Sequence, residues 1–150
     1  MPSSAIIRKQ IRDAIKARMA LITGTGGYYT TIGANITIKK TNPYDAVKLD
    51  GIDIADESEE QTVEAEDESL EQRTINFKIS IALKQVNPDI VLLAIADVEK
   101  AIKVDPTWGG LAIRTIPKGN SDEVDQQEFI FRGVNINIAV EYKTEIFNSE

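Results

Sequence analysis

The chain has 150 residues, of which 42% are hydrophobic, so it can form one globular domain that buries roughly 70% of its unfolded surface. It contains no cysteine and no histidine, which excludes disulfides, thiolate nucleophiles, Cys/His zinc sites and imidazole acid–base catalysis. Seventeen basic residues against 24 acidic ones give a net charge of −7, which argues against a general nucleic-acid-binding protein.

The first predicted element is an amphipathic helix over residues 4–22, because isoleucines from Ile7 to Ile22 recur close to one stripe at helical spacing. The glycine-rich segment 24–27 is predicted to end this helix, since glycine accepts the left-handed conformation. Three further elements are expected before residue 56, in chain order: a strand over 34–38, a turn at 41–45 and a weaker strand over 47–55.

Nearly half of the acidic residues lie in one stretch. From Leu49 to Gln72 there is no lysine or arginine, and eleven residues are acidic: Asp50, Asp53, Asp56, Glu57, Glu59, Glu60, Glu64, Glu66, Asp67, Glu68 and Glu71. Without these eleven charges the rest of the chain carries +4, so the protein is a mildly basic domain with one acidic insert. Because residues 56–69 offer almost nothing to bury, we expect a flexible acidic loop over about 56–70.

The clearest strand covers residues 74–84, where apolar residues from Ile75 to Leu83 alternate with polar ones, as in a sheet covered on one face. A second amphipathic helix is predicted from Asn87, a capping residue followed by proline, to about Lys103. The remaining elements are expected in this order: a short strand over 111–116, a polar tip at 118–122, and a long strand over 127–146 with a bulge at Gly133.

This order of elements predicts a single α+β domain spanning residues 1–150. We expect two layers, an antiparallel sheet of about four to five strands with two helices packed on one face, and a long acidic loop. Arg8 and Lys9 interrupt any export signal, and the longest uncharged apolar run, Ile90–Ala96, is far shorter than the ~20 residues of a membrane span. We therefore expect a soluble, intracellular chain without a membrane partner.

Few motifs indicate chemistry. Residues 24–27 lack the lysine of a phosphate-binding loop and follow a helix, so a helix end is favoured. Four acidic residues lack the order of an EF-hand, so a solvated segment is favoured over a calcium site: Asp50, Asp53, Asp56 and Glu57. Carboxylate pairs for hydrolysis form in space, and the sequence leaves them open. The missing base, metal ligands and cofactor fingerprint favour a protein that is not an enzyme and uses no cofactor or metal.

Two surfaces are candidates for contacts. The first predicted helix carries five basic residues against Asp13 alone: Arg8, Lys9, Arg12, Lys16 and Arg18. This face can contact phosphates or the acidic segment of a neighbouring subunit, or it can simply be solvated. The polar sides of the two long strands are small and uncharged, which suits packing against another protein as well as exposure to water: Asn76, Ser80, Asn135 and Asn137.

The segment Asp105-Pro106-Thr107-Trp108-Gly109-Gly110-Leu111, directly after the second predicted helix, resembles the Asp-x-Thr-x-Gly-Gly break of the tail terminator family of long-tailed bacteriophages. These are also called tail-tube completion or minor tail proteins. The final strand ending in Val140–Thr144 and the opening helix with its glycine-rich turn, Ile7–Gly27, are similar to the family as well. Tyr44–Leu49 departs from it, because the Leu-Pro that is frequent there is missing.

The resemblance implies a structural virion protein of the phage tail, assembled in the host cytoplasm. Such proteins form a ring, expected to be a homohexamer, that ends polymerisation of the tail-tube protein and joins the head-completion (connector) protein, while DNA passes through without specific binding. A closed ring needs two different complementary patches on each subunit. The candidate interface residues are Arg8, Arg12, Lys16, Glu57, Glu59, Glu60, Trp108, Gly109 and Gly110.

Two alternatives stay open. A head–tail joining protein or a tail-tube subunit of the same machinery would share these features, and a small hydrolase or ligand-binding module is the alternative from another class. Carboxylates near a channel through which DNA slides would also keep the DNA from sticking.

Overall fold

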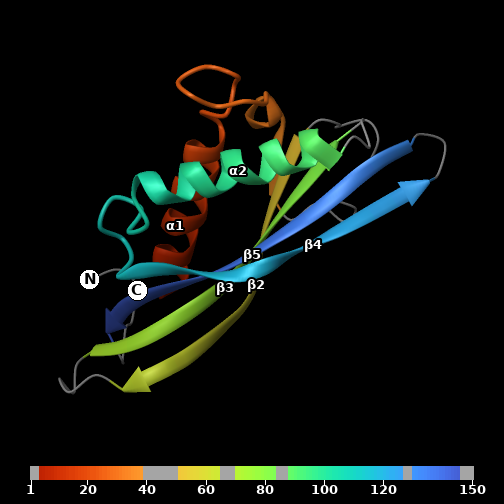
Figure 1. The fold of residues 1–150 in the computed structure, drawn as a ribbon. Coiled ribbons are helices and arrows are strands. Elements are labelled where there is room, and N and C mark those ends of the chain that lie inside the picture. Colours follow the sequence, from red (N-terminus) through yellow and green to blue (C-terminus); the bar gives the residue numbers. More distant parts are fainter. Residues whose placement is uncertain (1–3, 39–50, 65–69, 84–87, 127–129, 146–150) are drawn as a thin grey trace.

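The computed structural model describes residues 4–38, 51–64, 70–83, 88–126 and 130–145 (Figure 1). At positions 4, 57–64, 70–71, 88, 120–126, 130–133 and 144–145 it describes the backbone alone. Within these ranges the elements are α1 (Ser4–Met19), a 3-10 turn η1 (Ile32–Ala34), β1 (Ile36–Ile38), β2 (Gly51–Glu64), β3 (Leu70–Leu83), α2 (Pro88–Val104), β4 (Arg114–Gln126) and β5 (Ile130–Glu145).

The five described strands form one sheet in the order β1-β2-β3-β5-β4. The pairs β2–β3, β3–β5 and β4–β5 are antiparallel, whereas β1 pairs in parallel with β2. The sheet is therefore mixed, and the expectation of a purely antiparallel sheet is wrong at this one edge. The physical reason is direction: a tight hairpin joins only antiparallel strands, whereas β1 and β2 run the same way.

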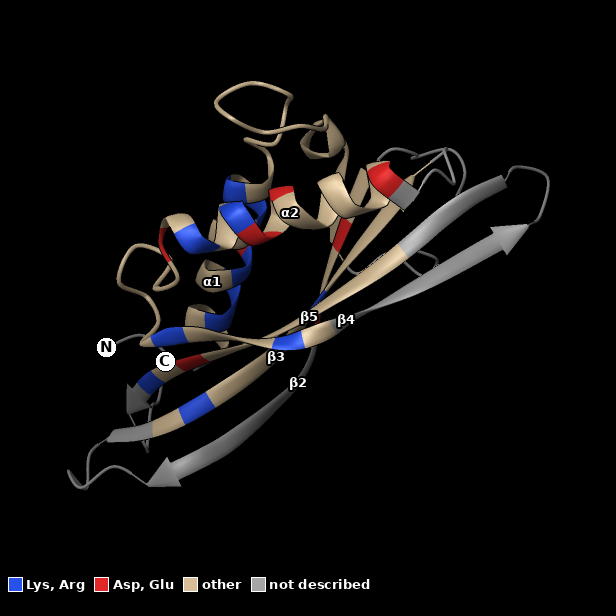
Figure 2. Ribbon diagram, in the orientation of Figure 1, with Lys and Arg blue, Asp and Glu red and all other residues tan. Residues whose placement is uncertain are grey.

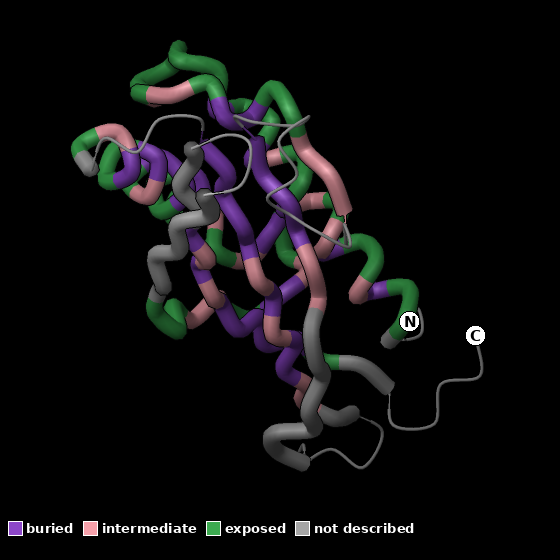
Figure 3. The backbone as a smooth tube through the Cα atoms, turned by 90° about the vertical axis from the view of Figure 1, so that its right-hand side faces the viewer, coloured by how far each residue is buried: buried purple, intermediate pink, exposed green. Residues whose placement is uncertain are grey.

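Both helices lie on one face of the sheet, as predicted, and the core fills the space between the two layers (Figures 1 and 3). Paired residues of neighbouring strands share a face, so Ile54, Ile79 and Ile136 lie abreast beneath the helices. α1 and α2 add buried residues at helical spacing: Ile7, Ile11, Ile15, Met19, Val91, Ala94, Val98 and Ala101. Each fully buried isoleucine contributes about 1.5–3 kcal/mol, which makes this stripe the main source of stability.

The acidic segment is not a loop over its first nine residues. Residues 56–64 continue β2 and pair with β3, with Glu59 opposite Ile75 and Glu60 opposite Thr74, so the expectation of a loop over 56–70 is wrong there. This half of β2 is held in place by its backbone ladder with β3, since most of its side chains are polar or charged. Beyond Ile54, where the pairing with β1 ends, β2 is the edge of the sheet, and two register shifts and the charges make this edge resist further pairing. Residues 65–69 lie outside the described ranges.

Several boundaries also differ from expectation. α1 ends at Met19, although Ile22 is still buried, and Leu21 is exposed. β4 begins at Arg114 and continues through the expected polar tip at 118–122. Ala34 belongs to η1 and not to a strand. Three predicted features lie outside the described ranges: the turn at 41–45, residues 47–50 of the second strand, and Phe129.

The bulge expected at Gly133 is absent, because Gly133 pairs regularly with Ala82 of β3 and Glu123 of β4. The irregularity lies instead on β4, where the register shifts between Pro117 and Asn120. Proline lacks the amide proton that a regular ladder needs, so the shift belongs on the strand that carries it.

The hairpin of β2 and β3 and the hairpin of β4 and β5 extend past the helices at opposite ends of the sheet (Figure 1). We call the part of β2 and β3 that runs from residue 56 to 64 and from 70 to 76 the acidic arm. Helices therefore cover only the central part of the long strands.

Candidate subunit interface

Basic residues, drawn blue in Figure 2, recur along α1, and one of them, Arg8, contacts Asp56 at the start of the acidic arm. Asp56 lies opposite Phe77 in the sheet, which places it on the face that the helices cover. Its Oδ2 atom accepts a hydrogen bond of 2.5 Å from Nη2 of Arg8. This candidate basic residue therefore has an acidic partner within its own chain, 48 residues away.

Next to this ion pair α1 encloses a small cavity of about 200 Å³, which we call the arginine hollow; it is lined by Ala5, Arg8, Lys9, Arg12 and Asp56. Nε of Arg12 is buried and has no hydrogen-bond partner. A buried donor in this state is rare in folded proteins and marks a position where an acceptor fits.

Asp13 serves the two other cations of this helix turn. Lys9 donates to its Oδ2 atom at 2.9 Å, and Nη2 of Arg12 lies 3.6 Å from its Oδ1 atom. The hydrogen bond from Lys9 lowers the pKa of Asp13 below its ordinary value, with further lowering by the charges of Lys9 and Arg12. Lys16 is exposed one turn further on, and in the described part of the chain it makes no ion pair.

Glu57, Glu59 and Glu60 are placed by their backbone on β2, and Glu59 lies opposite the buried Ile75, on the face that the helices cover. Their side chains lie outside the description. The contact predicted between these residues and the basic residues of a neighbouring subunit therefore stays a prediction.

The turn after α2 has a structural role that its motif partly indicated. Asp105 accepts hydrogen bonds from the hydroxyl and amide of Thr107 at 2.6 and 3.0 Å and from the amide of Gly109 at 2.8 Å. The Thr107 hydroxyl, the Gly109 amide and the Thr107 amide lower the pKa of Asp105 in that order. A run of Asp, Thr and Gly is typical of turns closed by their own side chains, and the sequence reasoning did not use this signal.

Trp108 belongs to the core, so its assignment to a partner interface is wrong. Its side chain is 2% exposed, and its Nε1 atom donates to the hydroxyl of Thr115 at 2.8 Å. The guanidinium of Arg18 lies 4.7 Å from the ring centroid and donates to the Asp105 carbonyl at 3.0 Å. Arg18 thus holds the turn against α1 and is not part of the free basic face. Gly109 and Gly110 are exposed and remain candidates.

The glycine-rich loop is held by α2. Asp97 is buried and accepts the amides of Tyr29 and Thr30, and Lys100 donates to the Gly27 carbonyl at 3.0 Å. The Asp97 carboxylate occupies the amides of Tyr29 and Thr30, which follow residues 24–27. The helix already ends at Met19, so the glycines follow its end and do not form it, and periodicity alone did not reveal the role of Asp97.

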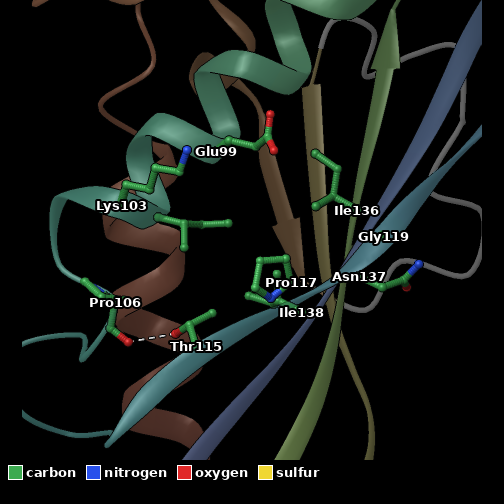
Figure 4. A pocket seen from close by; sticks show the side chains of 10 residues that line it. Glu99, Lys103, Pro106, Thr115, Pro117, Gly119, Ile136, Asn137 and Ile138 are labelled. Carbon is green, nitrogen blue, oxygen red and sulfur yellow. Dashed lines mark hydrogen bonds between the residues drawn. The ribbon is translucent and has the colours of Figure 1, made fainter.

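The largest hollow is an apolar pocket of about 300 Å³ between α2 and the strands β4 and β5 (Figure 4). Its walls are mainly aliphatic, and the Thr115 hydroxyl at its side is engaged with the Pro106 carbonyl at 2.7 Å. Glu99 is the single carboxylate among the lining residues, and Lys103 is the single cation. The pocket therefore lacks the pair of carboxylates that glycoside hydrolysis uses.

The face of the sheet away from the helices is polar, as predicted. Ser80 donates to the side chain of Asn135 at 2.9 Å, and Arg114 pairs with Glu141 at 2.5 Å. Asp53 accepts a hydrogen bond from Thr37 at 2.5 Å, so two of the four acidic residues considered for calcium, Asp53 and Asp56, already have partners. Within the described ranges, no three acidic side chains gather as metal ligands would.

Neither described helix is both long and apolar enough to cross a bilayer. Comparison of the sequence with protein-family models and with curated proteins finds no match. The function is therefore inferred from the residues themselves and from the shape of the sheet.

Proposed function

We propose that this chain is a tail terminator subunit, a structural protein of the virion tail of a long-tailed bacteriophage. Copies of the chain form a ring, hexameric by the family pattern, on the head-proximal end of the tail tube. The ring ends polymerisation of the tube and offers a joining surface to the head-completion protein. DNA passes through it without specific binding, and the subunit is made in the host cytoplasm.

The observation that carries this proposal is the length of the strands. β2, β3, β4 and β5 have 14, 14, 13 and 16 residues, where a strand in a globular protein usually has about 5–6. Their ends extend past the helices at both ends of the sheet (Figure 1). β3 pairs with both β2 and β5 along the acidic arm, so the arm is the end of a multistranded sheet, and a sheet end that extends past its covering layer is a surface that another subunit can complete.

The charge distribution supports a head-to-tail contact. The basic face of α1 and the acidic arm are different patches on one subunit, which is the requirement for a closed heterologous ring. The resemblance of residues 105–111 and 140–144 to the family adds the expectation of where in a virion such a ring acts.

Light scattering after size exclusion, followed by electron microscopy of negatively stained particles, tests the ring. We expect one oligomer of defined size that appears as closed rings. The ring is then added to polymerising tail-tube protein encoded beside this chain, with an unrelated acidic protein of similar net charge as control. We expect tubes to stop growing only with the ring.

A strict monomer that also leaves tube length unchanged would overturn the proposal. Tubes that become longer and incorporate the chain would instead identify it as a tail-tube subunit. Tubes that are unaffected while the chain binds purified head-completion protein would identify it as a head–tail joining protein.

A further inference from the structure

We infer that the arginine hollow of α1 binds one carboxylate from the acidic strand β2 of a second copy of this chain, and that Arg12 is the residue that binds it. This inference rests on the proposed ring and names the contact between its subunits. One earlier expectation changes with it: Arg8, predicted to contact a neighbouring subunit, pairs with Asp56 of its own chain.

Arg12 has the weakest ion pair of the three basic residues that line the hollow. Arg8 pairs with Asp56, and Lys9 pairs with Asp13 at 2.9 Å. Arg12 has an ion pair of 3.6 Å to the same Asp13 carboxylate. Of these three cations, Arg12 is therefore the one that a further carboxylate would stabilise most.

The buried Nε atom of Arg12 shows where that carboxylate would bind. It has no hydrogen-bond partner although it is shielded from water, and it lies on the wall of an open cavity of about 200 Å³. A guanidinium binds a carboxylate through two parallel N–H groups, and Nε with a terminal nitrogen forms one such pair. An entering carboxylate would thus satisfy a donor that is otherwise desolvated without compensation.

The composition of the chain indicates the occupant. Asp56 shows that the hollow already accepts one carboxylate of the acidic segment, and ten others lie between residues 49 and 72 with no lysine or arginine among them. Beyond Asp56 the backbone of β2 leads past the helices (Figure 1). Lys16, exposed one turn after Arg12, extends the basic surface along which such a strand can lie.

A nucleic-acid phosphate is the other anion to consider, and the charges disfavour it. The whole chain carries −7, and a DNA backbone approaching Arg12 would also approach the acidic arm that begins at Asp56. Repulsion of this kind selects against phosphate polymers and leaves a carboxylate on a protein strand as the matching partner.

The test is the association of purified full-length chains, measured by mass photometry at low and high salt. Arg12→Gln and Arg12→Glu should weaken association by about ten- to hundredfold per contact, because each removes a charge-assisted bidentate bond. Lys103→Gln is the matched control, since it removes one exposed cation from α2, and it should leave association unchanged. Thermal unfolding checks that Arg12→Gln stays folded, as expected for a side chain whose buried Nε atom has no bond to lose.

A charge exchange identifies the partner. Arg12→Glu in one chain and the double change Glu59→Arg/Glu60→Arg in another should each prevent assembly alone. Mixed in equal amounts, the two chains should form rings in which they alternate. Recovery of assembly in the mixture supports the inference, and failure to recover while both variants stay folded contradicts it.

Different results would overturn the carboxylate contact and the proposed ring. Rings of the parent chain that persist unchanged in Arg12→Glu overturn the carboxylate contact and leave the ring standing. A monomeric parent chain overturns the proposed function itself. Loss of duplex-DNA binding in Arg12→Glu, with rings intact, overturns the carboxylate in favour of a phosphate.

Discussion

Replacing Asp97 by alanine removes the carboxylate that fastens the loop between α1 and β1. Asp97 is 1% exposed, and its two oxygens accept the Tyr29 amide at 2.9 and 3.1 Å, the Thr30 amide at 2.7 Å and the Thr30 hydroxyl at 2.6 Å. Each amide left without an acceptor costs about 1–3 kcal/mol. The exposed side chain of Tyr29 shows that water reaches part of this loop, so we expect the low end of that range, about 1–1.5 kcal/mol at each of the two amides and about 2–3 kcal/mol in total.

Alanine has a higher helix propensity than aspartate, and this difference offsets at most about 0.7 kcal/mol of the loss. The net expected loss in the free energy of unfolding is therefore about 1.5–2.5 kcal/mol. Urea unfolding followed by circular dichroism measures it, at one fixed protein concentration because association would shift the midpoint. Thr30→Val removes the hydroxyl alone and should cost about 1 kcal/mol.

Glu99→Ala is the matched control, since Glu99 is exposed on the same helix and makes no ion pair in the described part of the chain. It should change stability by less than about 0.5 kcal/mol. If Asp97→Ala is as mild as this control, the four contacts of Asp97 contribute no net stability to the fold, and the prediction is wrong.

Two further predictions concern the backbone and pH. Gly33→Ala should destabilise the fold by about 2–4 kcal/mol in thermal or urea unfolding, because a Cβ atom there would lie 2.3 Å from the Met19 carbonyl oxygen; a neutral result would show that the chain after α1 shifts freely. The pKa of Asp105 is lowered in the folded chain by the Thr107 hydroxyl and by the Gly109 and Thr107 amides, so its contribution is present above the ordinary value of 3.8 and is lost as pH falls through the folded pKa. Between pH 7 and pH 3 the urea midpoint of the parent should therefore fall more than that of Asp105→Asn, and equal falls would contradict the assignment.

The elements that follow a strong local period were predictable from the sequence. The stripe from Ile7 to Ile15 placed α1, the amphipathic pattern of residues 87–103 placed α2, and the alternation in β3 placed the central strand. These patterns predict the elements because the spacing of apolar residues within a segment determines which of its faces can be buried. Their combination was sufficient for the two-layer α+β domain.

The features that the sequence does not predict depend on pairing between segments that lie far apart in the chain. The acidic half of β2 has no apolar alternation, and its strand form comes from the ladder with β3. The ion pair of Arg8 and Asp56 joins residues 48 positions apart, so charge counting placed both groups on a free surface. Trp108 was read from its motif as an interface residue, whereas its burial depends on the packing of the turn against Arg18. Three-dimensional neighbours decide all three cases.

The strand order also affects how fast the chain folds. β3 and β5 lie side by side at the centre of the sheet, with Ile75 opposite Val140, so the centre cannot close until β5 is available. Pairing between segments so far apart carries a large loop-closure entropy, and chains dominated by such contacts fold on the slow side, in milliseconds to seconds. During synthesis the first helix and β3 must wait for β5. A newly made chain therefore presents no finished binding surface before β5 has been synthesised, which would separate folding from assembly in time.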